Sequence, residues 1–198
     1  MDQTLINNFV IHETLKDAST HKPEGFNDIF LWNAIWKAHL DTMTGARFHG
    51  ESYLTNSKKE DPKIQKQLYC IIENAEEDLC SKYLLDELEK TELISSSEYG
   101  FTQKIVNMTL KYLIMLNAFG KTSFKIDEEN CDCPLDSQIL KRLHSINEKT
   151  YKNIKWTQLE KEDYTNIQRD IKECLGEESN KGNMYFDYKY YSNDNDVT

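Results

Sequence analysis

Two ionisable side chains, Lys104 and Asp136, have the types and settings that nucleophilic chemistry requires. Lys104 lies near the start of a strongly apolar segment, and an amine becomes a useful nucleophile when burial desolvates it or positive charge lies nearby. Asp136 follows Pro134 at the predicted start of a helix, where unpaired backbone N–H groups favour a charged carboxylate. The alternative is structural for each residue: a solvated lysine, and an aspartate that only caps a helix.

The residues around this pair form a longer pattern. In the segment GFTQKIVNM, Gly100 stands four residues before Lys104, and Asn107 stands three residues after it. An apolar helix, a loop and the segment CPLDSQILKRL follow, with Asp136 at the start of the next predicted helix. This pattern, which covers about a quarter of the chain, roughly residues 95–145, resembles the helix-hairpin-helix superfamily of DNA glycosylases.

The resemblance implies a function and a set of site residues. By motif position, Lys104 is the nucleophile that attacks the anomeric carbon of a flipped nucleotide, and Asp136 is the carboxylate that assists by electrostatics and proton transfer. The residues expected to contact DNA are Gly100, Thr102, Gln103, Lys141 and Arg142. The side chains that are candidates for stacking on the flipped base, with core packing as the alternative, are Trp32, Trp36 and Trp156.

Two features indicate which branch of the superfamily the chain resembles. Thr102 occupies the place of the hairpin's second glycine, where the backbone amides of the family approach a DNA phosphate. Lys104 and Asp136 lie 32 residues apart, which is similar to the archaeal 8-oxoguanine glycosylase branch with its degenerate hairpin. The resemblance therefore implies a DNA glycosylase and AP lyase acting on a damaged base, such as an oxidised purine, without an iron–sulfur cluster or other cofactor.

The charge of the chain favours a different class of partner. The net charge is −10, and non-specific binding to nucleic acid depends on Lys and Arg neutralising phosphates. Residues 100–161 nevertheless carry a net +3, which fits a local phosphate-binding face or an ordinary solvated surface. Residues 60–99 and 162–198 carry −7 and −5. The alternative to an enzyme is therefore a non-catalytic acidic protein that binds a protein partner or regulates a nucleic-acid enzyme.

The elements that must position these residues are predicted to be helices. Only 7 Gly and 3 Pro occur in 198 residues, too few for a turn-rich β-sandwich or barrel. Apolar residues at helical spacing predict a helix after a cap at Asn27, a second from Pro62 to Leu79, a short one over 83–92, a buried one over 103–119, one opened by Pro134, and a last one after Trp156. We expect one all-α domain over residues 1–198, with a partly irregular tail over 176–198.

Two further patterns bear on the environment of the chain. Its longest apolar stretch is far shorter than the roughly 20 residues that cross a bilayer, and no basic region precedes the apolar residues of the N-terminus. We therefore expect a cytoplasmic protein without membrane contact. The five cysteines are an odd number, which fits reduced thiols rather than structural disulfides.

Other residues offer weaker candidates for chemistry. Cys131-x-Cys133 with His144 is a partial metal-ligand pattern, but it lacks the second Cys or His pair of a zinc site, so no metal is predicted. His39 and His49 have the chemistry for proton transfer or phosphate contact, while packing or solvation is the structural alternative.

Overall fold

The computed structural model describes residues 24–47, 63–93, 99–147, 149, 151 and 154–191. Within these ranges the elements are helices, joined by turns and by one isolated parallel bridge between Leu79 and Ile126. The α-helices are α2 (Ile29–Arg47), α3 (Lys63–Glu73), α4 (Ser81–Glu89), α5 (Tyr99–Ala118), α6 (Ser137–Asn147), α7 (Lys161–Leu175) and α8 (Met184–Tyr191). The 3-10 helices are η4 (Glu128–Asn130), η5 (Trp156–Gln158) and η6 (Gly176–Lys181). The predicted all-α class is confirmed for the described residues.

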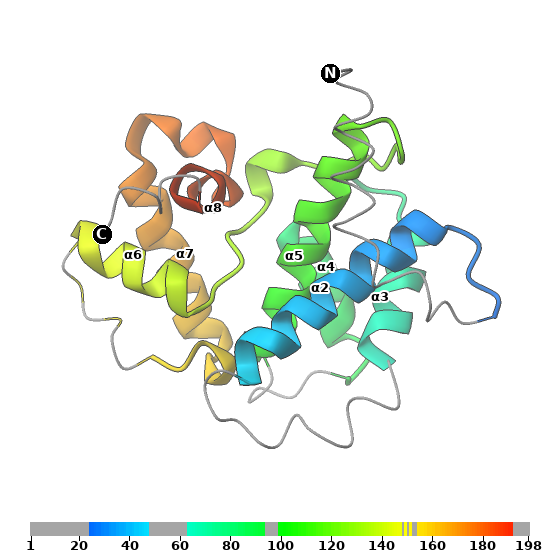
Figure 1. Ribbon diagram of the computed structural model, residues 1–198, viewed down its shortest axis with the longest axis horizontal. Coiled ribbons are helices and arrows are strands. Elements are labelled where there is room, and N and C mark those ends of the chain that lie inside the picture. Colours follow the sequence, from blue (N-terminus) through cyan, green and yellow to red (C-terminus); the bar gives the residue numbers. More distant parts are fainter. Residues whose placement is uncertain are drawn as a thin grey trace.

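Helix α5 lies between two groups of helices. In Figure 1, α2 crosses in front of α5 beside α3 and α4, whereas α6, α7 and α8 lie together on the other side. Every residue of α5 from Tyr99 to Asn107 is buried, as expected for a helix enclosed on all its faces. Buried apolar residues of both groups join one hydrophobic cluster around it. Among the described helices, none is both long and apolar enough to cross a membrane.

The first helix begins one residue later than predicted. Asp28, not Asn27, caps α2, because its Oδ1 accepts the amides of Phe30 and Leu31 at 2.9 and 3.0 Å. The helix then continues through Gly45 and ends at Arg47. The apolar residues of α2 before Gly45 pack against α5, and this burial outweighs the low helix propensity of one glycine.

The prediction that one helix runs to Leu79 was wrong, because α3 ends at Glu73. Leu79 instead pairs with the segment before η4: its N–H donates to Lys125 O at 2.8 Å, and its carbonyl accepts from Asp127 N at 2.9 Å. Leu79 is 2% exposed, so the helical spacing of the apolar residues correctly indicated that it is buried. The same spacing did not show that the helix ends before it. A buried residue satisfies its backbone groups in whichever element supplies partners.

The last part of the chain is more ordered than predicted. Helix α7 ends at Gly176, which has φ +55°, and the chain continues through η6 into α8. Phe186 is fully buried and Met184 is 2% exposed, so α8 is attached to the core by its own apolar side chains. The predicted irregular tail therefore does not describe residues 176–191; residues 192–198 lie outside the described ranges.

Candidate functional site

The candidate site is assembled around an extended segment, residues 131–136, which runs from η4 to α6. Two buried glutamines hold its backbone from two different helices. Gln168 of α7 accepts from Cys133 N at 3.1 Å and donates to Cys133 O at 2.7 Å. Gln103 of α5 does the same at Leu135, at 3.3 and 3.2 Å. The two side chains therefore replace the partner strand that an extended segment usually needs.

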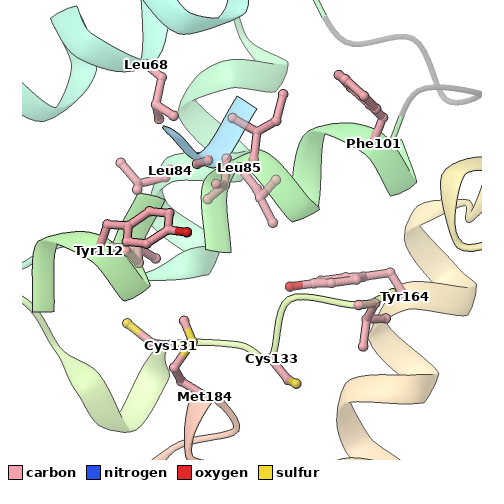
Figure 2. Close-up of a cluster of buried hydrophobic side chains, with 14 of the residues drawn as sticks. Leu68, Leu84, Leu85, Phe101, Tyr112, Cys131, Cys133, Tyr164 and Met184 are labelled. Atoms are coloured by element: carbon pink, nitrogen blue, oxygen red, sulfur yellow. The ribbon is translucent and has the colours of Figure 1, made fainter. Parts of the chain in front are cut away.

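Figure 2 shows this segment from the side of the core. The side chains of Cys131 and Cys133 leave it in different directions, and the ring of Tyr164 lies close by. Burial raises the pKa of both thiols, so they are neutral, apolar groups of the core. In the part of the chain that the structure describes, no three His, Cys, Asp or Glu side chains are grouped to hold a metal ion.

Asp136 stands at the end of the segment and makes contacts with both oxygens. Its Oδ1 accepts from Gln138 N at 2.8 Å and from Ile139 N at 3.0 Å, so it is the N-cap of α6. Its Oδ2 accepts from Lys104 Nζ at 3.0 Å. The cap fixes the orientation of the carboxyl group, and the second oxygen is thereby directed at the lysine. The sequence brought these two residues together only as a family pattern, whereas the structure brings their charged atoms into contact.

Lys104 is unusually enclosed for a lysine. Its side chain is 7% exposed, against 29% for its partner Asp136. The ammonium lies 4.7 Å from the centre of the Trp156 ring, a cation–π contact. A buried ammonium is tolerated when an opposite charge and an aromatic face replace water, and both are present here. The arrangement holds one amine, one carboxylate and one indole within a few ångströms of each other.

Trp156 is brought to this position by a close contact between η5 and the first turn of α5. Gly100 N donates to Leu159 O at 3.0 Å. A Cβ atom on Gly100 would overlap the carbonyl oxygen of Trp156 and lie 2.9 Å from Leu159 N. Glycine is required because the two backbones touch, which is a different reason from the DNA contact that the sequence predicted for Gly100.

A chain of buried polar side chains lies next to the pair. Asn107 Nδ2 donates to the hydroxyl of Tyr164 at 2.9 Å, and that hydroxyl donates to Asp132 Oδ2 at 2.7 Å. Burial raises the pKa of Asp132, although the hydrogen bonds from Tyr164 and Asn183 oppose the rise. Asn107 Oδ1 is buried, and no hydrogen-bond partner is found for it among the described residues. Polar side chains therefore lie in the core close to Lys104 along α5.

Two predicted DNA contacts do not reach the surface. Thr102 and Gln103 are both 0% exposed, and Gln103 is saturated by hydrogen bonds within the chain. In this conformation neither side chain offers a group to a phosphate. The prediction failed because a helix enclosed on all sides buries positions that a helix at the surface would expose. The resemblance gave each residue a position in the motif. It did not indicate which faces of the helix are covered by neighbouring elements.

The basic residues of α6 lie on its outer side. Lys141 is exposed, and Arg142 is half-buried with its guanidinium 5.2 Å from the ring centre of Tyr190 in α8. Both cations lie on the helix that Asp136 caps. Cation–π contact leaves the donor groups of an arginine free at its edge, so stacking does not exclude contact with phosphate.

The three tryptophans do not form one pocket. Trp32 is fully buried, stacks on Trp36 at 5.9 Å between ring centres, and lies against Phe26 and Tyr69. This contact belongs to the packing of α2 on α3, so core packing is the role that the structure gives to Trp32. Trp156 contacts Lys104 through its ring. Trp156 is thus the member of the predicted set that adjoins the candidate site.

The histidine candidates lie apart from the pair or outside the description. His39 is buried, and Gln65 Nε2 lies 2.7 Å from its Nδ1 across the α2–α3 contact. His49 lies outside the described residues. His144 Nδ1 lies 2.7 Å from Lys149 O near the end of α6, whereas Cys131 Sγ donates to Asp127 O at 3.4 Å.

Sequence reasoning missed two residues that build the site and gave a third another role. Gln168 and Tyr164 were not identified as site residues, and Gln103 was predicted to contact DNA; all three are buried and hold the segment or the polar chain. The sequence did hold one signal, because uncharged polar residues stand at positions that the helical period turns inward. A buried polar side chain nearly always has a hydrogen-bond partner, which is commonly a backbone group. Comparisons of the chain with known protein families, with curated proteins and with solved structures find no match.

Proposed function

We propose that the chain is a DNA glycosylase and AP lyase that acts on a damaged base through a Schiff base at Lys104. The observation that carries the proposal is the contact between Lys104 Nζ and Asp136 Oδ2 at 3.0 Å, with the lysine side chain 7% exposed. Desolvation is one of the ways in which a lysine becomes a nucleophile, and the side chain of Lys104 is largely removed from water. The resemblance described above gives the same two residues these roles.

In the proposed reaction the lone pair of the Lys104 amine forms a bond to C1′ of the nucleotide, and the N-glycosidic bond breaks. The Lys104 ammonium loses its first proton, through Asp136, to the departing base, which leaves with the bonding electrons. The nitrogen bonded to C1′ gives a second proton to O4′ as its lone pair opens the sugar ring, and a protonated imine then joins C1′ to Nζ. The three protons of the ammonium are thus divided between the base, O4′ and the imine. Asp136 Oδ2 supplies the negative charge that stabilises the cationic sugar during bond breaking.

The test is reduction of the imine with borohydride on duplex DNA that carries one oxidised purine or one abasic site. We expect a covalent adduct from the wild-type protein and none from Lys104→Gln. Lys111→Gln is the matched control, because Lys111 lies on the same helix and also pairs with an aspartate, Asp187. The absence of an adduct from folded wild-type protein on all of these duplexes overturns the proposal.

A second candidate is the non-catalytic acidic protein with a protein partner. It is favoured by four exposed carboxylates at the end of α3 and in the turn after it, at Glu73, Glu76, Glu77 and Asp78. Burial of Thr102 and Gln103 also removes two of the predicted DNA contacts. The salt dependence of duplex binding separates the two candidates, since only an enzyme that contacts several phosphates loses affinity steeply as salt rises.

A further inference from the structure

The carboxamide of Gln103 is the most completely bonded side chain near the candidate site. Its Nε2 donates to Gly100 O at 2.8 Å and to Leu135 O at 3.2 Å. Its Oε1 accepts from Leu135 N at 3.3 Å and from Asn107 Nδ2 at 3.2 Å. A glutamine has two donor hydrogens and one acceptor oxygen with two lone pairs, so every position is used. The two amide donors that face Oε1 also fix which end of the carboxamide is oxygen.

Gln103 and Lys104 are consecutive, and so are the residues that they hold. Gln103 grips both backbone polar groups of Leu135, and Lys104 pairs with the side chain of the next residue, Asp136. The distance between Lys104 Nζ and Asp136 Oδ2 therefore depends on where Gln103 places the segment. We infer that Gln103 is a positioning residue, which keeps Asp136 Oδ2 within hydrogen-bonding distance of Lys104 Nζ. The importance of this position for catalysis rests on the proposed function.

Gln168 provides the matched control within the same structure. It pairs with both backbone groups of Cys133, two residues before Leu135, and it comes from α7 rather than α5. Gln168 is 5% exposed and Gln103 is fully buried, so both substitutions remove a carboxamide from the core. The difference that the experiment uses is that Gln103 holds the residue adjacent to Asp136, and Gln168 holds Cys133 instead.

The first experiment measures the accessibility of the Lys104 amine without using any activity. Full-length wild type, Gln103→Leu and Gln168→Leu are treated briefly with an acylating reagent, and the modification of Lys104 is compared by mass spectrometry with that of exposed Lys141 in the same sample. We expect Gln103→Leu to raise the ratio about tenfold, because two hydrogen bonds that hold the segment are lost. We expect Gln168→Leu to leave the ratio near the wild-type value.

A second variant keeps the test decisive if Gln103→Leu does not fold. In Gln103→Glu the neutral acid still donates one hydrogen bond and accepts from Leu135 N, whereas the carboxylate faces two carbonyl oxygens, which raises its affinity for a proton. We expect its labelling ratio to lie near that of the wild type at about pH 6 and to exceed it about fivefold at about pH 9. A merely structural glutamine predicts a ratio that does not follow pH in this way.

The third readout joins the inference to the proposed function. In borohydride trapping, Gln103→Leu should lower the rate of adduct formation at saturating DNA about tenfold and leave the affinity for DNA unchanged, and this fall in rate should exceed that of Gln168→Leu. Equal labelling of Lys104 in both leucine variants, or no rise in either, overturns the positioning role. If the wild type forms no adduct, the proposed function fails, but the labelling ratios still decide whether Gln103 places Asp136.

Discussion

Replacement of Asp136 with alanine separates the two tasks of its carboxyl group. The cap of α6 contributes about 1 kcal/mol, the usual cost of replacing an N-cap aspartate with alanine. The ammonium of Lys104, whose side chain is 7% exposed, then has no carboxylate partner. Leaving this buried charge unpaired costs about 3 kcal/mol of unfolding free energy. The lower end of the range for buried pairs applies, because the side chain of Asp136 is 29% exposed. We expect Asp136→Ala to lose about 4 kcal/mol of unfolding free energy.

Equilibrium unfolding in urea, followed by circular dichroism, measures this loss. Asp136→Asn is the matched control, since its amide oxygen keeps the cap but the charge is gone, and it should lose about 3 kcal/mol. In the background of Lys104→Met, the same Asp136→Asn substitution should cost less than about 1 kcal/mol, because no ammonium is left unpaired. An equal cost of Asp136→Asn in both backgrounds would refute the claim that the two charges stabilise each other.

Three further predictions concern two residues near the site and one ion-pair cluster in η6. Gly100→Ala should lose more than about 2 kcal/mol in urea unfolding, because its Cβ overlaps the carbonyl of Trp156; a loss below about 0.5 kcal/mol contradicts that close approach. Tyr164→Phe removes a hydrogen bond that lowers the pKa of Asp132, so the pKa of this carboxyl in the folded protein rises further. A carboxyl with a raised folded pKa destabilises the protein as pH rises. The loss of unfolding free energy of this variant relative to the wild type should therefore be larger at pH 7 than near pH 5. Glu178 is held by two lysine ammonium groups that lower its pKa to about 2, so its stabilising contribution is present above its unfolded pKa and lost as pH falls toward 2; a carboxyl titration by NMR with a midpoint near about 4 contradicts this.

The helices that hold the site were largely predictable, because their apolar residues follow the helical period. The stripe of α7 and the buried stretch of α5 appear directly in the sequence. The end of α3 was not, since Leu79 continues the same stripe while its backbone pairs with Lys125 and Asp127. Periodicity reports which residues are buried, and it does not distinguish a helix from an extended residue that finds partners elsewhere.

The site itself was predicted in part. Lys104 and Asp136 were identified from a pattern, and the structure brings their charged atoms to 3.0 Å. Gln103 was expected on DNA but lies in the core, because the partner of a carboxamide depends on which segment folds against it. Trp156 contacts Lys104 only because Gly100 lets η5 approach α5. Such contacts depend on the path of the backbone between distant residues, which single-sequence patterns do not contain.

The central claim is that the amine of Lys104 bonds to the sugar of a damaged nucleotide. The most direct measurement is to reduce the complex of full-length protein and lesion-bearing duplex with borohydride, digest it, and identify by mass spectrometry the residue that carries the reduced sugar. The account predicts a single modified residue, Lys104, at the end of α5 that faces Asp136. A sugar attached to any other amine, or no modified peptide from folded and DNA-bound protein, would contradict it.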